Sequence, residues 1–153
     1  MGEELTIAGA GSHVTITILD YERPKGREVG PEWLSCAVDC SVGSFNAKLA
    51  IPLATEDLQR FRDSLGRVVE RLVGNAAMDT IEGRIGIVVE MSSRGTATVS
   101  GNLSYHSGPD ASLSFKFETD QSYLTRTLRE LNRVLEVFPD RAPSFSGRPP
   151  SSG

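Results

Sequence analysis

The stretch LSCAVDCSVGSFNAKLAI, residues 34–51, decides the fold class. Apolar residues occupy every second position over residues 34–42 and again over residues 45–51, with Gly43-Ser44 between the two runs. Strict alternation predicts two half-buried strands, and a Gly-Ser pair between such strands predicts a tight turn. The stretch therefore predicts an antiparallel sheet with one apolar and one polar face.

A change of spacing after Pro52 predicts a helix. The apolar residues there follow helical spacing instead of alternation: Leu58, Phe61, Leu65, Val68 and Leu72. We expect Thr55 to be the N-cap, with Glu56-Asp57 favourable near the positive end of the helix dipole, and Gly74-Asn75 to end the helix in a left-handed turn. Gly66 lies inside this helix, where glycine costs up to about 1 kcal/mol relative to alanine, so fraying or close packing is expected there.

The rest of the chain extends this pattern to two similar units. Alternating apolar runs predict strands at residues 5–7 and 14–18 before the quoted stretch, and at 78–81, 85–91, 97–105 and 113–117 after it. Asp120 is the expected N-cap of a second helix over residues 124–138, which Pro139 stops. Gly101 is expected to weaken or bulge its strand. We therefore expect an α+β fold, with antiparallel sheets built as two successive four-strand-plus-helix units and the helices packed on the sheet.

An offset of 66 residues brings the two units into register. In the helices it aligns six residues with identical residue types: Leu58, Arg60, Leu65, Arg67, Val68 and Glu70. It also keeps the apolar row of residues 45–51 in phase with that of residues 111–117. Duplication of one ancestral unit explains this register, and so does the similarity of any two amphipathic helices. The order of four strands and a helix, found twice, is a firmer prediction than the duplication.

The chain of 153 residues has the usual size of one domain. We expect residues 1–139 to form a single α+β domain. Residues 140–153 are rich in Pro, Ser and Gly, so we expect them to be a flexible tail. Residues 26–31 are likewise expected to be a mobile loop between two strands.

Charge and cysteine usage bound the function. The formal net charge of -4 argues against a general affinity for nucleic acid or anionic membranes. No apolar run approaches the roughly 18 residues of a membrane span, and the acidic N-terminus is unlike a signal peptide. On one strand Cys36 and Cys40 would lie about 13 Å apart, whereas a disulfide needs less than about 7 Å. Two unpaired thiols favour the cytoplasm or another reducing compartment.

Catalytic and metal-binding constellations are not apparent. His13 and His106 lie far apart near turn residues, and two inward cysteines do not complete a zinc ligand set. The glycine-rich residues 8–12 precede a strand and not a helix, so they predict a turn and not a phosphate-binding loop. We therefore expect no catalytic residues, no metal and no cofactor. A non-enzymatic binding protein is the leading interpretation. A hydrolase-like enzyme with an unrecognised site is kept as a further hypothesis.

In order of elements alone, two units of four strands and a helix resemble the Whirly and PUR-type proteins that bind single-stranded nucleic acid. Such proteins bind through aromatic platforms interleaved with basic residues on an open sheet face. Here Trp33 is the only aromatic residue expected on the outer face of a strand. The other outer positions are small and polar: Thr15, Thr17, Ser35, Asp39, Ser41, Asn46, Lys48, Thr98, Ser100, Asn102, Ser104, Ser112, Ser114 and Lys116. Nucleic-acid binding is therefore kept only as the alternative.

The last strand and helix carry the most distinctive motif. The segment FKFETDQSYL, residues 115–124, runs into Leu128, Glu130-Leu131, Val134-Leu135 and Phe138-Pro139. This resembles the C-terminal signature of the WapI-type immunity proteins, partners of the wall-associated contact-dependent toxins of bacteria. Other parts agree: VTITILDYE at residues 14–22, Trp33-Leu34, and then Leu53, Thr55, Asp57-Leu58, Phe61 and Leu65. The resemblance therefore spans about residues 5–139 in colinear order. It departs at Gly30-Pro31-Glu32, where an Asp- or Asn-bearing segment is expected before the Trp-Leu pair.

This resemblance implies a cytoplasmic protein that binds and blocks the toxic C-terminal domain of a cognate toxin, often a nuclease. An acidic protein gains association rate toward a basic partner by electrostatic steering, so a basic toxin domain is expected. Candidate contacts are Tyr21, Glu22, Glu32, Trp33 and Asp39, because aromatic side chains beside carboxylates suit an interface anchor. The alternative is that Tyr21 and Trp33 pack beneath the loop that precedes the Trp-Leu pair.

Overall fold

The computed structural model describes residues 2–23, 30–105 and 111–141. The elements are β1 (Glu3–Gly9), β2 (Ser12–Tyr21), β3 (Trp33–Val42), β4 (Phe45–Ala50), β5 (Leu53–Ala54), α1 (Thr55–Arg71), β6 (Gly74–Asp79), β7 (Ile85–Met91), a 3-10 turn at Ser93–Gly95, β8 (Thr96–Ser104), β9 (Ser112–Asp120) and α2 (Gln121–Val137). The predicted order of four strands and a helix, twice, is confirmed. Most of the predicted loop at 26–31 and all of the predicted tail beyond residue 141 lie outside the described residues.

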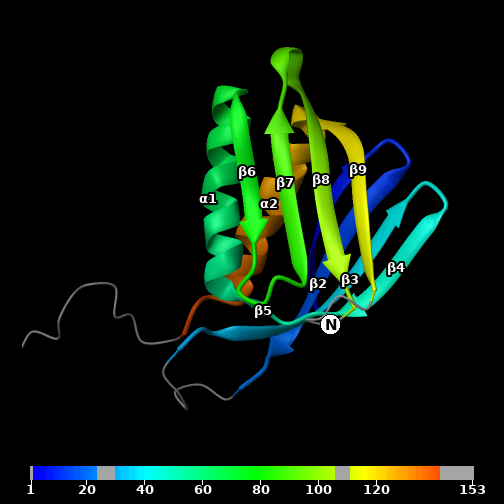
Figure 1. Ribbon diagram of the computed structural model, residues 1–153. Coiled ribbons are helices and arrows are strands. Elements are labelled where there is room, and N and C mark those ends of the chain that lie inside the picture. Colours follow the sequence, from blue (N-terminus) through cyan, green and yellow to red (C-terminus); the bar gives the residue numbers. More distant parts are fainter. Residues whose placement is uncertain (1, 24–29, 106–110, 142–153) are drawn as a thin grey trace, which may run out of the picture.

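Both sheets are antiparallel meanders. The first sheet has the order β1-β2-β3-β4, and the second has the order β6-β7-β8-β9 (Figure 1). The first sheet also includes the short β5, because Pro52 interrupts the fourth strand and the chain then pairs again with the start of β3. In the second unit the equivalent strand β9 continues for nine residues without a break.

Each helix packs against the first strand of the other unit. The two helices have 17 residues each and begin 66 residues apart, as the sequence offset predicts. Helix α1 lies along β6, and α2 lies along β1 (Figure 1). The hydroxyl of Thr127 in α2 donates to the carbonyl oxygen of Thr6 at 2.7 Å, and the amide of Thr6 donates to Oε1 of Glu130 at 2.9 Å. Side chains of α2 therefore satisfy the outer edge of β1.

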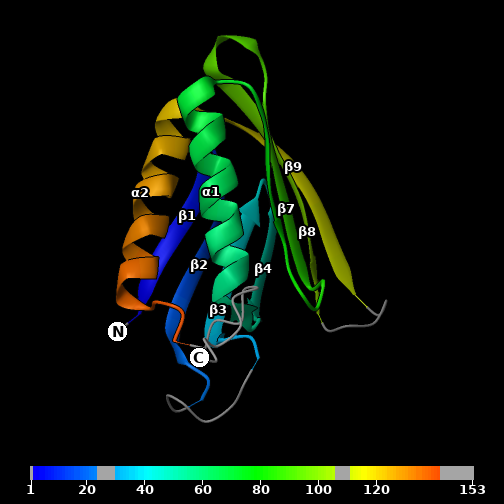
Figure 2. The ribbon, with the colours of Figure 1, turned by 90° about the vertical axis from the view of Figure 1, so that its left-hand side faces the viewer.

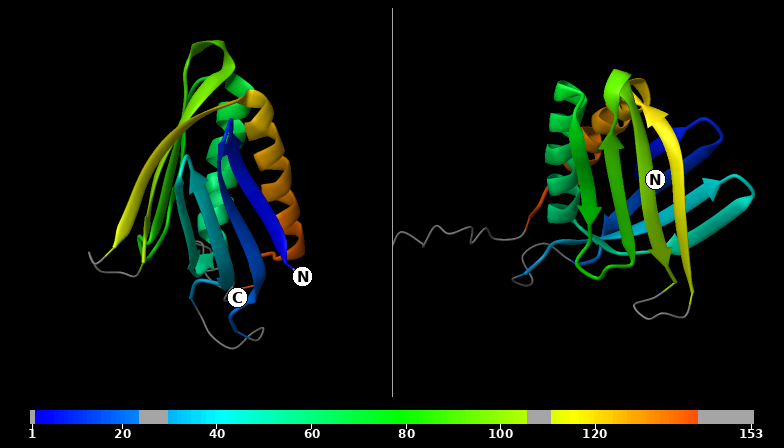
Figure 3. Two further views of the ribbon diagram at one scale, coloured as in Figure 1. Left: turned by 90° about the vertical axis from the view of Figure 1, so that its right-hand side faces the viewer. Right: turned by 45° about the horizontal axis from the view of Figure 1, so that its top comes forward.

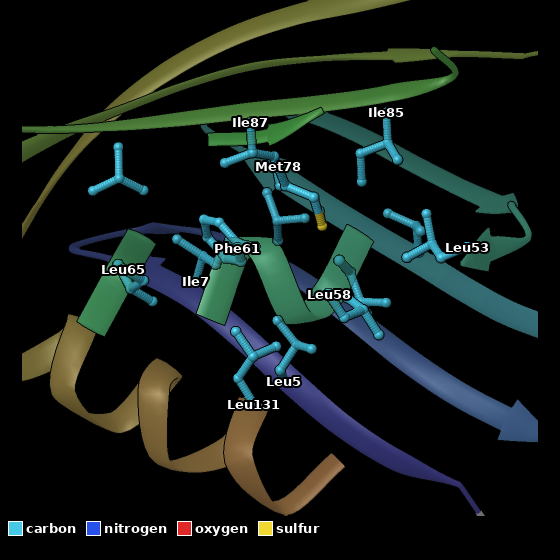
Figure 4. Close-up of a cluster of buried hydrophobic side chains, with 14 of the residues drawn as sticks. Leu5, Ile7, Leu53, Leu58, Phe61, Leu65, Met78, Ile85, Ile87 and Leu131 are labelled. Carbon is cyan, nitrogen blue, oxygen red and sulfur yellow. The ribbon is translucent and has the colours of Figure 1, made fainter. Parts of the chain in front are cut away.

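One continuous apolar core joins both sheets and both helices. In Figure 4 the side chains of α1 lie in the middle: Leu58, Phe61 and Leu65. Met78, Ile85 and Ile87 of the second sheet lie on one side of them, and Leu5 and Ile7 of β1 and Leu131 of α2 lie on the other. In β2, β3 and β7 the buried residues alternate with more exposed ones, as the period of two predicts.

Two helix-end predictions are wrong. Ala54, not Thr55, is the N-cap of α1, because β5 keeps Ala54 extended and paired with Trp33. The alanine side chain has no acceptor, so it makes no capping bond. At the other end the left-handed cap is Leu72, with φ of 56°, since β6 already begins at Gly74. The prediction for α2 is confirmed, because the side chain of Asp120 accepts a hydrogen bond from the amide of Tyr123 at 3.1 Å.

Gly101 neither bulges nor breaks β8, which pairs with both neighbours without a register shift. A Cβ at this position would lie 2.5 Å from Cζ of Phe115, so the missing side chain makes room for that ring. Gly66 shows no such constraint, because a Cβ there would meet only Cδ1 of Leu128, at 4.0 Å.

The two sheets are close at one end and diverge at the other. At the close end, a Cβ on Gly9 in β1 would overlap the carbonyl oxygen of Glu118 in β9, and Thr119 donates to the carbonyl oxygen of Ala8 at 2.6 Å. Figure 2 and the left panel of Figure 3 show the lower ends of β8 and β9 standing away from β3 and β4. Phe45, expected in the inward row of β4, is instead 68% exposed, at the tip of the β3–β4 hairpin beside the Gly43-Ser44 turn.

Candidate functional site

Two of the five predicted contact residues hold the end of the described chain in place. Glu32 accepts hydrogen bonds at Oε1 from the backbone amide and from Nε of Arg141, both at 2.9 Å. The guanidinium of Arg141 lies over the ring of Tyr21, 3.4 Å from its centre, and the Tyr21 hydroxyl donates to the carbonyl oxygen of Pro139 at 2.7 Å. Tyr21 also makes an edge-on contact with Phe138. These side chains are engaged within the protein.

The ionisation of this cluster follows from its contacts. Burial raises the pKa of the Glu32 carboxyl, but the hydrogen bonds and charge of Arg141 outweigh burial, so that the pKa lies below its ordinary value. Burial raises the pKa of the Tyr21 hydroxyl above its ordinary value, against the opposing charge of Arg141. At neutral pH the cluster is therefore a charged pair stacked on a neutral phenol.

Of the other three predicted contact residues, Glu22 and Trp33 lie beside that cluster and Asp39 lies apart from it. Glu22 is exposed at the end of β2, where its amide donates to the carbonyl oxygen of Trp33 at 3.0 Å. Trp33 is half-buried at the start of β3. Asp39 lies further along β3, where Lys48 approaches it to 3.8 Å. The structure brings Tyr21 and Glu32 together and leaves Asp39 apart.

Asp57 does more than favour the helix dipole. Its side chain is fully buried, Arg60 donates to it at 2.6 Å, and the amides of Ile81 and Ala54 also bond to it. Burial raises the pKa of the Asp57 carboxyl above its ordinary value, although the Ile81 amide and the Arg60 charge both lower it. This carboxyl ties the start of α1 to the segment between β6 and β7. Asp57 is three residues after the N-cap Ala54, the position from which the acidic residue of a capping box bonds back to the amide of the N-cap residue. This spacing can be read from the sequence.

The cysteines are free and buried, as predicted. Burial raises the pKa of the Cys36 thiol to about 12 and that of Cys40 above its ordinary value. Such thiols are poor nucleophiles at neutral pH. Within the described ranges, no three His, Cys, Asp or Glu side chains are grouped so that they could hold a metal ion. Neither described helix is long and apolar enough to cross a membrane.

The outer face of the second sheet is hollowed. The hollow has a volume of about 590 Å³, and small side chains line most of it, including Ala77, Gly86 and Ser100. Around it the outer face carries three carboxylates and one ammonium group: Asp79, Glu90, Glu118 and Lys116. This face presents no aromatic platform in the described strands.

The diverging ends of the two sheets enclose an apolar cleft of about 260 Å³. Ala47 and Leu49 of β4 form one wall. The other wall comes from β8, β9 and the residues beside them: Leu103, Tyr105, Ala111, Ser112 and Leu113. Tyr105 is 61% exposed, and Leu49 and Leu113 are half-buried. These inward-facing residues continue the core rows of both sheets, but nothing in the described chain covers them fully.

The sequence contains a signal for this cleft, although alternation alone assigns its residues to the core. The 66-residue offset aligns the row that begins at Phe45 with the row that begins at Ala111, and both rows end in the buried residues Ile51 and Phe117. Ala47 and Leu49 of the first row and Ala111 and Leu113 of the second row line one opening. Pattern analysis predicts which face a residue occupies, but not whether a second layer reaches it.

The fold defines the class of protein, and comparison with known proteins gives the family. The fold is a two-unit α+β domain, and one solved structure similar to it is the "CdiA-CT/CdiI toxin and immunity complex from Enterobacter cloacae". The matched chain is 12% identical, with a TM-score of 0.44, over 77% of this chain and 97% of that chain. The sequence matches the immunity protein WapI-like family over residues 5–139, and the chain belongs to this family. No curated protein matches it.

Proposed function

We propose that this protein is a non-enzymatic immunity protein that binds a cognate bacterial toxin domain in the cytoplasm and neutralises it. Membership of the immunity protein WapI-like family over residues 5–139 carries this proposal. The buried thiols and the large share of small polar side chains on the outer sheet faces fit a binding role. Among the described residues nothing favours nucleic-acid binding, since the exposed aromatic residues Phe45, Tyr105 and Tyr123 do not form a ladder with basic residues on a sheet face.

The toxin domain is expected to be basic. The protein has a net charge of -4, and Asp79, Glu90 and Glu118 give the outer face of the second sheet an acidic excess. Electrostatic attraction of this kind raises the association rate and weakens with salt. An association rate that does not change between low and physiological salt would argue against a basic partner.

Of the residues predicted from sequence, Glu22, Trp33 and Asp39 remain proposed contacts. Tyr21 and Glu32 are proposed to act indirectly, because their side chains anchor residues 139–141. The domain is proposed to comprise residues 1–139 with the anchored Asp140 and Arg141, followed by a flexible tail.

The test is protection of cells from the toxin. The C-terminal domain of the toxin encoded beside this gene is expressed from an inducible promoter, with and without this protein. We expect growth to be restored only when this protein is present, and the two purified proteins to co-elute in gel filtration. A family member from a different toxin locus is the matched control. A toxin domain that kills cells equally in both cases, and forms no complex, would overturn the proposal.

A further inference from the structure

One edge of β4 is open. Strand β4 pairs with β3 on one side, and no described residue pairs with its other side. Strands β1 and β6 differ, because α2 bonds to the edge of β1 and α1 packs against β6. Strand β9 meets β1 at its end, at Ala8 and Thr119, and the rest of its outer edge has no partner strand among the described residues. An open strand edge is a template for pairing with another chain.

The register of the β3–β4 hairpin shows which backbone groups face outward. The amide of Ile51 donates to the carbonyl oxygen of Cys36 at 3.0 Å, so these two residues form a hydrogen-bonded pair. Bonded pairs recur at every second residue in an antiparallel ladder. The N–H and C=O groups of Ala47 and Leu49 therefore face β3, and those of Asn46, Lys48 and Ala50 face the open edge.

The open edge adjoins the apolar cleft. A strand added beside β4 would direct alternate side chains toward the cleft side, next to Ala47 and Leu49 and opposite Leu103 and Leu113. Its remaining side chains would lie on the outer face, next to Lys48. Main-chain bonds to the edge and apolar contacts in the cleft would thus act together, as in other cases of strand addition.

Charge selects the occupant of this edge. Lys48 is 81% exposed, and its nearest carboxylate, that of Asp39, lies at 3.8 Å and is itself 46% exposed. An acidic side chain directly opposite Lys48 on an added strand would form a favourable cross-strand pair. A second copy of this chain would bring its own Lys48 to the same edge, and an edge lysine is a usual protection against such self-pairing.

We propose that the open edge of β4 and the adjoining cleft bind an extended segment of the toxin domain. This segment has apolar residues at alternate positions, which enter the cleft, and an Asp or Glu opposite Lys48. The inference rests on the proposed function, because it names the surface through which that function is performed.

Proline substitution tests the backbone pairing. Lys48→Pro removes an outward N–H and leaves the amides that bond to β3 in place, whereas Lys48→Ala removes the same charge and keeps the N–H. We expect Lys48→Pro to weaken toxin binding by about tenfold beyond Lys48→Ala, in line with one lost hydrogen bond. Lys48→Glu is expected to weaken binding more than Lys48→Ala does. Thermal unfolding of each variant checks that the fold persists.

Substitution within the cleft tests the apolar contacts, independently of the backbone pairing at the edge. Leu49→Ser removes apolar surface from the cleft, and Val88→Ser removes a similar group from the outer face of the second sheet, where Val88 is exposed. We expect Leu49→Ser to weaken binding by about tenfold or more and Val88→Ser to leave it unchanged.

The outcomes separate this inference from the function on which it rests. An unaltered protein that neither binds the toxin domain nor protects cells overturns the proposed function. An unaltered protein that protects, together with Lys48→Pro and Leu49→Ser variants that bind as tightly as it does, overturns only the inference. Loss of binding in Val88→Ser alone would place the interface on the second sheet. A dimer in analytical ultracentrifugation that Lys48→Pro abolishes would assign the edge to a second copy.

Discussion

Thr127 and Thr6 lie 121 residues apart in sequence and are joined by a hydrogen bond of 2.7 Å, from the hydroxyl of Thr127 to the carbonyl oxygen of Thr6. Thr127 is fully buried, and the same hydroxyl also lies 3.1 Å from the carbonyl oxygen of Tyr123 within α2. Through this bond and that of Glu130, the last helix completes the hydrogen bonding of the first strand. The two ends of the domain are thereby held together.

Thr127→Val is expected to destabilise the protein by about 1–3 kcal/mol, because it preserves shape but leaves the Thr6 carbonyl without its donor. Urea unfolding followed by circular dichroism measures the change. Thr125→Val is the control, since the hydroxyl of Thr125 bonds only within its own helix, to Gln121. Equal destabilisation by both variants would contradict a special role for the bond between α2 and β1.

Alanine is expected to have opposite effects at two glycines. Gly9→Ala should destabilise the protein by about 1–3 kcal/mol, because the added Cβ would overlap the Glu118 carbonyl and push the sheets apart. Gly66→Ala should stabilise it by up to about 1 kcal/mol, because alanine favours the helix and the space is free. Thermal and urea unfolding measure both. A stabilising Gly9→Ala would show that the sheets can separate there without cost.

Asp57 should make stability fall as pH rises. Its pKa is raised in the folded protein, so ionisation above the unfolded-state value of 3.8 is opposed by the fold and lowers the free energy of unfolding. Asp57→Asn removes this ionisation. We expect the difference in free energy of unfolding between the unaltered protein and Asp57→Asn to shrink as the pH rises from about 4 to about 7. Asp63→Asn, on the same helix, controls for the loss of one negative charge. An advantage that grows with pH would contradict burial as the dominant effect.

Arg141 is expected to stabilise the domain although it lies at the end of the described chain. A chain ending at Arg141 should unfold at a higher temperature than one ending at Pro139, because only the longer one pairs with Glu32 and stacks on Tyr21. The pKa of Glu32 is lowered, so this contribution is present above the unfolded-state value of 4.5 and is lost as pH falls below it. Glu32→Gln in the full chain should reproduce the loss. Identical melting temperatures for both truncated chains at pH 7 would sink the prediction.

The alternation of apolar residues and the helical spacing that follows it were sufficient to predict the fold class, the order of the main elements along the chain and the inward face of most strands. Both sheets and the cap at Asp120 follow from local chemistry of this kind. The helix start at Ala54 was not predictable in the same way, because β5 forms only when the chain returns to β3. Tertiary pairing decides such boundaries.

The candidate site was harder to predict than the fold. Tyr21 and Glu32 have the chemistry of interface anchors, yet Arg141, 109 residues from Glu32, engages both. Leu49 and Tyr105 have the pattern of core residues, but their exposure depends on how the two sheets diverge. Residue type and period predict a face, whereas access to that face depends on distant layers of the same domain.

The exchange of helices between the two units has a consequence for synthesis on the ribosome. The first strand to emerge, β1, obtains its edge partners from α2, the last described element, and from the end of β9. While the first unit alone has been translated, the amide and carbonyl groups of Thr6 have no helix to bond with, and β6 is not yet present to cover α1. The nascent first half is therefore incomplete as a folding unit. Native structure is expected after translation of the whole domain, so truncated products would be open to proteolysis and would not compete for the toxin.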